Sequence, residues 1–270
     1  MTNNNLPPHH SVKNMIFRKN NKKLKPSTSK NISKDLWCEG LPIHVAIIPD
    51  GNRRWALEQK VDPWEGHEAG AKNTEEIIKK ASDLRIKQLS IWGSSINNLE
   101  KRPINEKRAL LDIYERYFSK LINGEDIHKN ETRISVIGRW EEYFPESLKK
   151  IFKEGIEKTK NYKKRFINIF LAYNGDDDML EAVKKIAKKY DSADKVTAET
   201  IKENLMTKDL PPVDLLIRTG GDPHLSVGFM MWDIANAQLY FSKKFYPDFN
   251  GDEFEKAIRE YQNRKRRMGK

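Results

Sequence analysis

Short apolar runs recur along the sequence from residue 41 onward, and each is bounded by Gly, Pro, Asn or Asp. Runs of this length and composition are typical of buried strands. The predicted strands are residues 44–49, 87–93, 133–137, 166–172, 213–217 and 238–241.

The stretches between these runs carry apolar residues at helical spacing, so that each set falls on one helix face. The sets are Ile77, Ile78, Ala81 and Leu84; Leu110, Leu111, Tyr114, Tyr117, Phe118 and Leu121; and Leu148, Ile151, Phe152 and Ile156. Parallel strands need crossover connections, and helices usually supply them. The alternation therefore predicts an α/β fold, a single domain with a central, mostly parallel β-sheet of about six strands flanked by helices. Ligands of such folds bind beyond the carboxyl ends of the strands.

The charge is unevenly distributed along the 270 residues. The formal net charge is +11, and eight Lys or Arg residues with two acidic residues place six of these charges within residues 1–40. Residues 1–37 are rich in Asn, Lys, Ser and Pro and cannot bury much apolar surface, so we predict a disordered basic extension. A nucleic-acid groove binder carries its excess charge on a folded face, so this distribution argues against nucleic acid. Peripheral contact of the extension with an anionic membrane stays open.

Cysteine usage and hydropathy restrict the cellular environment. Cys38 is the single cysteine, which excludes an intramolecular disulfide and a cysteine-rich metal site. No run approaches the roughly 18 apolar residues of a membrane span, and the basic N-terminus lacks the apolar stretch of a secretion signal. We expect a cytoplasmic protein, possibly membrane-associated.

The first run ends in residues suited to a phosphate ester, in the sequence HVAIIPDGNRRWA at residues 44–56. Asp50 offers one oxygen ligand to Mg²⁺, and Gly51 allows the backbone to approach a ligand closely. Arg53 and Arg54 carry guanidinium groups that fit phosphate oxygens. The competing interpretation is a strand that ends in an Asp-Gly turn with solvated arginines.

A second run ends in the same way, in the sequence VDLLIRTGGDPHLSVGFMMW at residues 213–232. Here Arg218 precedes Gly220 and Gly221, and His224 and Ser226 follow. Two strand ends that each offer Arg and Gly predict two anion pockets. An ordinary tight turn is the alternative for this motif taken alone.

Taken together and in order, these blocks resemble the cis-prenyltransferases, the family of undecaprenyl diphosphate synthase. The resemblance covers residues 41–270, and we take residues 38–270 as the catalytic domain. Its blocks are HVAIIPDGNRRWA, then Gly66, His67 and Gly70, then SSINNLEKRP, LAYNGDDDMLEAV, IRTGGD and the closing RRMG. It implies a Mg²⁺-dependent, homodimeric enzyme whose fold encloses a hydrophobic tunnel and whose substrates are isoprenoid diphosphates.

The resemblance also implies roles for individual residues. Asp50, as the Mg²⁺ ligand, and Asn98, as an aid to proton removal, are the expected catalytic residues. The allylic diphosphate site is expected to contain Gly51, Asn52, Arg53, Arg54 and His67. Ser95 is expected beside the reacting carbons together with Asn98, and Trp55 and Lys101 are further expected substrate-binding residues. The site of isopentenyl diphosphate is expected to contain Arg218, His224 and Ser226, with Arg267 and Gly269 reaching it across the dimer. Gln238 is a second expected metal ligand. From the residues alone, His67 is equally explained as a helix cap, and Ser95 and Asn98 as loop residues that satisfy backbone groups.

Several positions depart from the family pattern. Pro63 and Lys101 stand where arginines are usual, and lysine lacks the bidentate guanidinium fork. In the second site, His224 replaces an arginine and Gln238 replaces a glutamate, so the metal environment there loses a carboxylate.

The resulting prediction is a transferase that condenses an allylic prenyl diphosphate with isopentenyl diphosphate into a Z-configured polyprenyl diphosphate. One alternative is a short or branched product formed from two allylic diphosphates. Another is an inactive partner subunit, although the Asp50 motif is intact. Product length and the allylic primer stay open.

Overall fold

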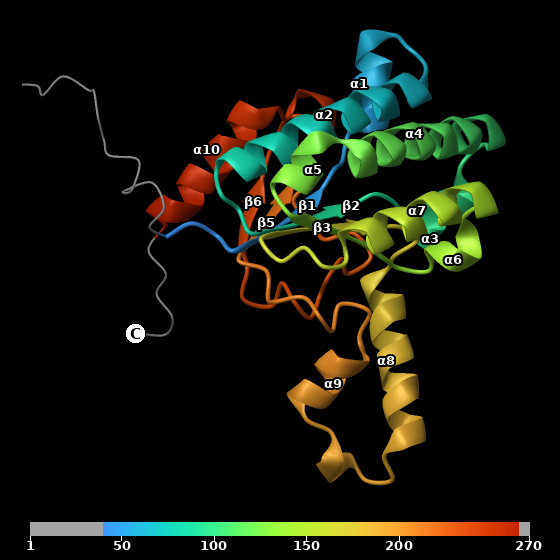
Figure 1. Ribbon diagram of the computed structural model, residues 1–270, viewed down its shortest axis with the longest axis vertical. Helices are drawn as coiled ribbons and strands as arrows, with labels where there is room; N and C mark the ends of the chain where they lie inside the picture. Colours follow the sequence, from blue (N-terminus) through green and yellow to red (C-terminus); the bar gives the residue numbers. More distant parts are fainter. Residues whose placement is uncertain (1–39, 265–270) are drawn as a thin grey trace, which may run out of the picture.

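The computed structural model describes residues 40–264, which are built around one six-stranded, wholly parallel sheet (Figure 1). Its order is β3-β4-β2-β1-β5-β6. The strands are β1 (His44–Ile48), β2 (Gln88–Trp92), β3 (Thr132–Ile137), β4 (Arg165–Phe170), β5 (Leu215–Arg218) and β6 (Gln238–Phe241). The predicted α/β fold is confirmed, and each predicted strand boundary lies within two residues of the observed one. The predicted extension at residues 1–37 lies outside the described residues, as do Arg267 and Gly269.

Helices cover both faces of the sheet (Figure 1). They are α1 (Asn52–Gln59), α2 (Pro63–Asp83), α3 (Ile96–Lys101), α4 (Ile104–Asn123), α5 (Glu125–Lys129), α6 (Trp140–Tyr143), α7 (Glu146–Thr159), α8 (Gly175–Lys189), α9 (Ala198–Asn204) and α10 (Gly251–Asn263), with 3-10 turns η1 (Ala193–Lys195) and η2 (Tyr246–Asp248). The three apolar stripes predicted from the sequence belong to α2, α4 and α7. Within residues 40–264, no helix is both long enough and apolar enough to cross a membrane.

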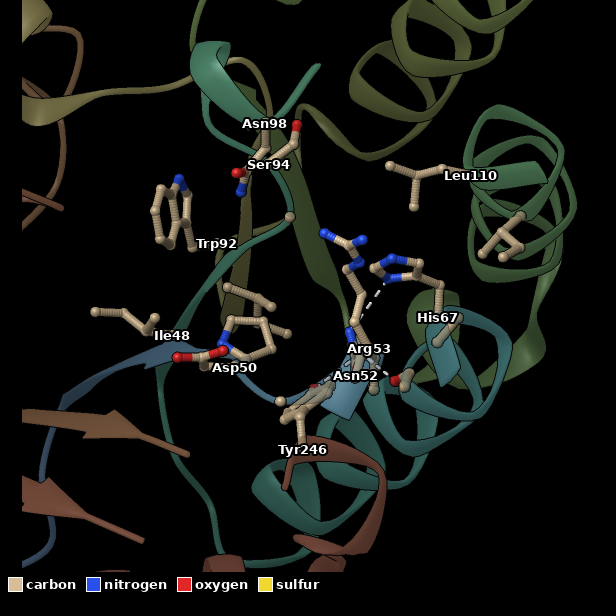
Figure 2. A pocket seen from close by; sticks show the side chains of 18 of the residues that line it. Ile48, Asp50, Asn52, Arg53, His67, Trp92, Ser94, Asn98, Leu110 and Tyr246 are labelled. Atoms are coloured by element: carbon tan, nitrogen blue, oxygen red, sulfur yellow. Dashed lines mark hydrogen bonds between the residues drawn. The ribbon is translucent and has the colours of Figure 1, made fainter. Parts of the chain in front are cut away.

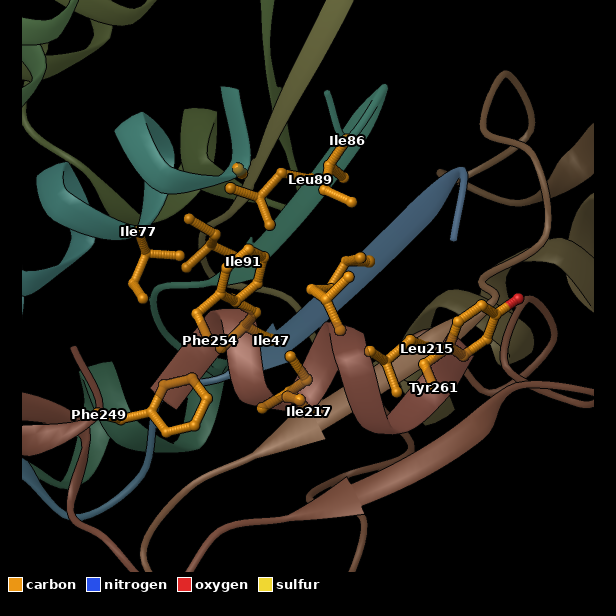
Figure 3. Packing of buried hydrophobic residues seen from close by; sticks show 14 of the residues in the cluster. Ile47, Ile77, Ile86, Leu89, Ile91, Leu215, Ile217, Phe249, Phe254 and Tyr261 are labelled. Atoms are coloured by element: carbon orange, nitrogen blue, oxygen red, sulfur yellow. The ribbon is translucent and has the colours of Figure 1, made fainter. Parts of the chain in front are cut away.

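Strand β1 is buried on both faces, which explains why its sequence is continuously apolar rather than alternating. Val45 and Ile47 pack in one cluster with residues of α2 and α10, and Figure 3 shows Phe254 of α10 lying against Ile47. Ala46 and Ile48 belong to a second cluster on the opposite face. Each fully buried large apolar side chain contributes roughly 1.5–3 kcal/mol to folding, so β1 is fixed firmly in the sheet centre.

The topology brings distant segments to one edge. The chain adds β2 on one side of β1 and later adds β5 on the other side, so β1 lies at the point where the strand order reverses. In open α/β sheets, this point is where ligands bind, outside the carboxyl ends of the strands. The segments after β1, β2 and β5 therefore meet there.

His44 begins β1 and is completely buried in a polar chain that ties three strands together. Its Nδ1 lies 2.9 Å from the Pro211 carbonyl oxygen and its Nε2 lies 2.8 Å from Ser90 Oγ. Asn168 Nδ2 donates to the same hydroxyl at 3.0 Å. These contacts fit a neutral imidazole that donates from Nδ1, and burial lowers the pKa of His44 below its usual value.

We predict that His44 makes the fold sensitive to acid. The pKa of His44 is lower in the folded than in the unfolded chain. The contribution of the neutral imidazole to the free energy of unfolding is therefore complete above the unfolded pKa, and it is lost as pH falls below that value toward the folded pKa. The free energy of unfolding should drop by up to about 1.4 kcal/mol per pH unit for this one proton. Denaturant unfolding of the wild type and of His44→Gln between pH 8 and 5 tests this. A wild-type profile parallel to that of the variant would refute it.

Candidate active site

A cavity of about 930 Å³ opens at the carboxyl edge of the sheet, between α2 and α4 (Figure 2). Its charged and polar lining comprises Asp50, Asn52, Arg53, Arg54, His67, Thr74, Glu75, Ser94, Asn97, Asn98, Lys101, Arg102, Arg218 and Ser226. Its apolar lining includes Ile78, Leu110, Ile113, Tyr114, Tyr117, Phe118, Leu121 and Ile169. Along α2 the lining runs from Pro63 to Ile78, a helix length of about 23 Å. The cavity therefore suits an elongated molecule with an anionic head and an apolar tail.

Asp50 follows β1 and joins the two strand-end motifs. Its Oδ2 accepts a hydrogen bond from Arg218 Nη2 at 2.6 Å, and its Oδ1 lies 3.1 Å from Arg54 Nη2. The Thr219 hydroxyl fixes the Asp50 backbone by accepting from its N–H at 2.9 Å and donating to its carbonyl at 2.7 Å. The carboxylate is 30% exposed and faces the cavity. The two anion pockets predicted from the sequence are thus parts of one shared cavity.

Small residues place His67 beside the start of α1. A Cβ on Gly66 would lie 2.1 Å from the Asn52 carbonyl oxygen, and one on Gly70 would lie 2.6 Å from Asn52 Oδ1. These glycines let α2 lie directly against α1. His67 consequently faces Asn52, with 3.5 Å between His67 Nδ1 and Asn52 Nδ2. Gly51, which precedes α1, has a φ of 107°, a conformation that glycine adopts without strain.

Two guanidinium groups present buried donors to the cavity. The Arg218 side chain is 4% exposed, and its Nε and Nη1 have no hydrogen-bond partner within the described part of the chain. The Arg102 side chain is 14% exposed, and its Nη1 also lacks a partner there. Buried polar groups are normally satisfied because leaving them unpaired is costly. An anion in the cavity is the partner that would satisfy both.

His67 and Glu106 form a buried pair beside these cations. Glu106 Oε1 lies 3.0 Å from His67 Nε2. Burial, followed by the charge of Arg102, lowers the pKa of His67 below its usual value. A neutral ring that donates from Nε2 to Glu106 leaves Nδ1 as an acceptor for the Asn52 amide.

Sequence comparison assigns the chain to a family. A sequence model of the Prenyltransf family, described as undecaprenyl diphosphate synthase, matches residues 48–269, well over half of the chain. The protein belongs to the undecaprenyl diphosphate synthase family. The resemblance inferred from the ordered motif blocks is confirmed.

Individual relatives agree with this family. The tritrans,polycis-undecaprenyl-diphosphate synthase (geranylgeranyl-diphosphate specific) of Methanocaldococcus jannaschii is 38% identical over 238 residues, covering 86% of this chain and 84% of the relative. An isoprenyl transferase of Enterococcus faecalis is 37% identical over 237 residues, covering 85% and 86%. The crystal structure of lavandulyl diphosphate synthase from Lavandula x intermedia, in complex with dimethylallyl diphosphate, is similar with a TM-score of 0.79 and 33% identity. It covers 86% of this chain and all of that one.

Three residues that the family resemblance assigned to substrate do not line the cavity in this family member. Trp55 is half-buried, and its indole donates to Asp248 Oδ1 at 2.9 Å. Ser95 caps α3, where its Oγ accepts from the Asn98 N–H at 3.0 Å, so that the neighbouring Ser94 faces the cavity instead. His224 is exposed, and its Nδ1 lies 3.7 Å from Asp222 Oδ2.

The guanidinium expected at Lys101 is found one residue later. Lys101 is exposed at the cavity lining, whereas Arg102 is mostly buried there. Arg102 follows α3 in an extended conformation with ψ of 143°, as is usual before a proline, here Pro103. The bidentate fork that a lysine lacks is therefore still present in the cavity.

Two carboxylates of the described residues line the cavity. Glu75 is paired with Lys120 Nζ at 2.7 Å, and Asp50 is the one beside the guanidinium groups and suited to Mg²⁺. Within residues 40–264, no group of three or more His, Cys, Asp or Glu side chains could hold a metal. Gln238 begins β6, two strands from β1, and lies about 10 Å short of the carboxyl edge. A single chain therefore does not bring Gln238 and Asp50 to one ion. Asp50 fits Mg²⁺ in the usual arrangement of one or two carboxylates plus substrate phosphates.

Sequence reasoning missed Ser94, Arg102 and Glu106. Glu106 left a readable signal, because it lies four residues before Leu110 and thus on the apolar face of α4. A charged residue on a buried stripe needs a partner. For Ser94 and Arg102, the side-chain directions depend on the exact limits of α3, which the sequence pattern does not define.

We predict that Arg102 contributes more than Lys101 to anion binding. Arg102→Met should weaken the binding of inorganic pyrophosphate with Mg²⁺ by roughly 10- to 100-fold, because a charge-assisted hydrogen bond is worth about 1.5–3 kcal/mol. Lys101→Met removes an exposed charge and should change affinity much less. Titration calorimetry on both variants measures this. Equal losses of pyrophosphate affinity in the two variants would show that Arg102 contributes no more to anion binding than Lys101.

Proposed function

We propose that the protein is a Mg²⁺-dependent cis-prenyltransferase. It joins an allylic prenyl diphosphate to isopentenyl diphosphate, forms a Z double bond and releases diphosphate. The observation that carries this proposal is the joining of two Arg- and Gly-rich strand ends at Asp50, in a cavity that continues between apolar walls. The activities for which the relatives in Methanocaldococcus jannaschii and Enterococcus faecalis are named, those of a polyprenyl diphosphate synthase and an isoprenyl transferase, support the same reaction class.

The allylic diphosphate binds at the amino end of α1. The backbone N–H groups of a helix start and the dipole of the helix favour an anion there. Arg53, Arg54 and Arg102 also line the cavity and add guanidinium groups. Bound Mg²⁺, held by Asp50 and the diphosphate oxygens, supplies positive charge for the departing diphosphate. Fixed cations are most useful where negative charge develops during the reaction, here as the C–O bond breaks.

Isopentenyl diphosphate binds next to Arg218 and Ser226, so its double bond can face the allylic carbon. The new C–C bond forms as the allylic C–O bond breaks, and one proton then leaves the isopentenyl carbon. Asn98 lies in the cavity lining on α3 (Figure 2), and we assign its carboxamide to orienting the group that accepts this proton. This role is the one that the family resemblance implies.

The apolar lining accepts the prenyl chain because its tyrosines have their hydroxyls engaged in the protein. Tyr114 donates to the Gly93 carbonyl at 2.9 Å, and Tyr117 donates to Glu68 Oε1 at 3.0 Å. Burial, followed by the Glu68 hydrogen bond, raises the pKa of Tyr117 to about 12, so its hydroxyl stays neutral. Both rings can therefore face the cavity without an unsatisfied polar atom.

A second candidate reaction is the condensation of two allylic diphosphates. His224, which stands for a family arginine, is exposed and does not line the cavity, so the second head-group site has fewer cations than expected. The similar crystal structure is that of a lavandulyl diphosphate synthase with dimethylallyl diphosphate. The two reactions differ in whether isopentenyl diphosphate is consumed.

We further propose that the enzyme is a cytoplasmic homodimer. A homodimer would let Arg267 and Gly269 of one chain approach the second head-group site of the other, and sedimentation velocity would detect it. We place the enzyme in the cytoplasm, with contact to anionic membrane through residues 1–37 and without a nucleic-acid partner. Vesicle binding by the full chain and by a chain lacking these residues tests the membrane contact.

We predict that product forms when isotope-labelled isopentenyl diphosphate is supplied with an allylic primer and Mg²⁺. Mass spectrometry should show a prenyl diphosphate extended by whole labelled C5 units. Asp50→Asn should lower kcat/KM by about 100-fold or more, because the carboxylate that would hold Mg²⁺ and that pairs with Arg54 and Arg218 is lost, and with it positive charge fixed beside the departing diphosphate. Asp112→Asn, on the exposed side of α4, is the matched control. Product from dimethylallyl diphosphate alone, without label incorporation, would instead establish the second candidate.

A further inference from the structure

Glu106 is a buried carboxylate that neither proposed substrate reaches. Its side chain is 4% exposed, and it does not line the cavity. It lies in the first turn of α4, where the helix dipole favours a negative charge. Burying a carboxylate still costs free energy unless cations and hydrogen-bond donors surround it.

Three cavity-lining side chains surround this carboxylate. His67 Nε2 lies 3.0 Å from Oε1 and Arg102 Nε lies 3.6 Å from the same atom, while Arg53 Nε lies 3.6 Å from Oε2. Arg53 comes from α1, His67 from α2, and Arg102 directly follows α3. Figure 2 shows Arg53 and His67 on the same side of the cavity. Side chains from three separate segments thus converge on Glu106.

Arg53 and Arg102 contact Glu106 through the Nε edge of the guanidinium group. Arg53 and Arg102 both approach Glu106 through Nε, so their Nη atoms remain available for another anion. For Arg102 this is visible directly, because its buried Nη1 has no partner within the described residues. Arginine presents a rigid planar fork. Fixing the Nε edge therefore fixes the direction of the Nη donors.

We propose that Glu106 is a positioning residue that aims Arg53 and Arg102 at the diphosphate of the allylic substrate from behind the cavity wall and holds His67 against Asn52. This inference rests on the proposed function and extends it to a residue that touches no substrate. Without Glu106, neighbouring cations would repel one another, and Arg53 in particular could turn to solvent. Binding would then require them to be ordered again.

Two effects of Glu106 oppose each other and must be separated. Its negative charge repels a bound diphosphate, whereas its contacts orient the cations that bind it. Glu106→Asp retains the charge and withdraws the carboxylate by one methylene, so it removes mainly the contacts. Glu106→Gln keeps the shape and removes the charge. Glu115→Asp, on the exposed side of the same helix, is the control.

We expect Glu106→Asp to weaken the binding of inorganic pyrophosphate with Mg²⁺ and to raise KM for the allylic diphosphate. Partners that orient a binding group typically change affinity or activity by about 10- to 100-fold. KM for isopentenyl diphosphate should stay near the wild-type value, because Arg218 and Ser226 do not touch Glu106. Calorimetry and steady-state kinetics measure these quantities, and thermal unfolding confirms that each variant is folded under assay conditions.

The outcomes separate cleanly. If Glu106→Asp behaves as the wild type while Glu106→Gln binds pyrophosphate more tightly, Glu106 acts through charge alone and the positioning role is wrong. A similar rise in KM for both substrates would mark general structural damage and would also overturn it. Failure of the wild type to bind pyrophosphate or form product would instead overturn the proposed function, and this inference with it.

Discussion

The ion pair between Asp50 and Arg218 holds the active-site edge together. The two residues are 168 positions apart, and they follow or end adjacent parallel strands, β1 and β5. Thr219 adds hydrogen bonds to both backbone groups of Asp50. Because Arg218 is almost completely buried and Asp50 faces the cavity, this contact connects the core of the sheet to its ligand-binding surface.

The contact between Asp50 and Arg218 exists only because the topology places β1 between β2 and β5. Each of these strands ends at the same edge, and each is followed by a segment that lines the cavity. The apolar walls come from α2 and α4, which pack on the same face of the sheet through the clusters around Ile77 and Leu110. Head-group and tail surfaces therefore derive from different parts of the fold, the strand ends and the covering helices.

The sequence predicted most of this arrangement because its signals are local. Apolar runs define the strands, and the Asp50 and Arg218 motifs directly follow two of them, so parallel topology alone brings them together. The sequence indicated less where a side-chain direction depends on a helix boundary. Ser95, predicted to contact substrate, caps α3, and Arg102 joins the predicted Lys101 in the cavity lining. The family resemblance implies Gln238 as a metal ligand, and the register places it at the opposite end of its strand from the active-site edge.

Two carboxylates, Asp50 in the cavity lining and Glu106 behind it, have different consequences for anion binding. Asp50 pairs with Nη2 of Arg54 and of Arg218, the terminal nitrogens that a phosphate group would also use. An incoming diphosphate must therefore compete with Asp50 for these nitrogens, and this exchange would free the carboxylate from its arginine partners. Glu106 pairs with Nε of Arg53 and Arg102 and competes for no terminal nitrogen. The Asp50 carboxylate can thus exchange its arginine partners for a ligand, whereas the Glu106 carboxylate keeps its partners when a ligand binds. The difference arises because Asp50 contacts the terminal nitrogens of the guanidinium groups and Glu106 contacts Nε.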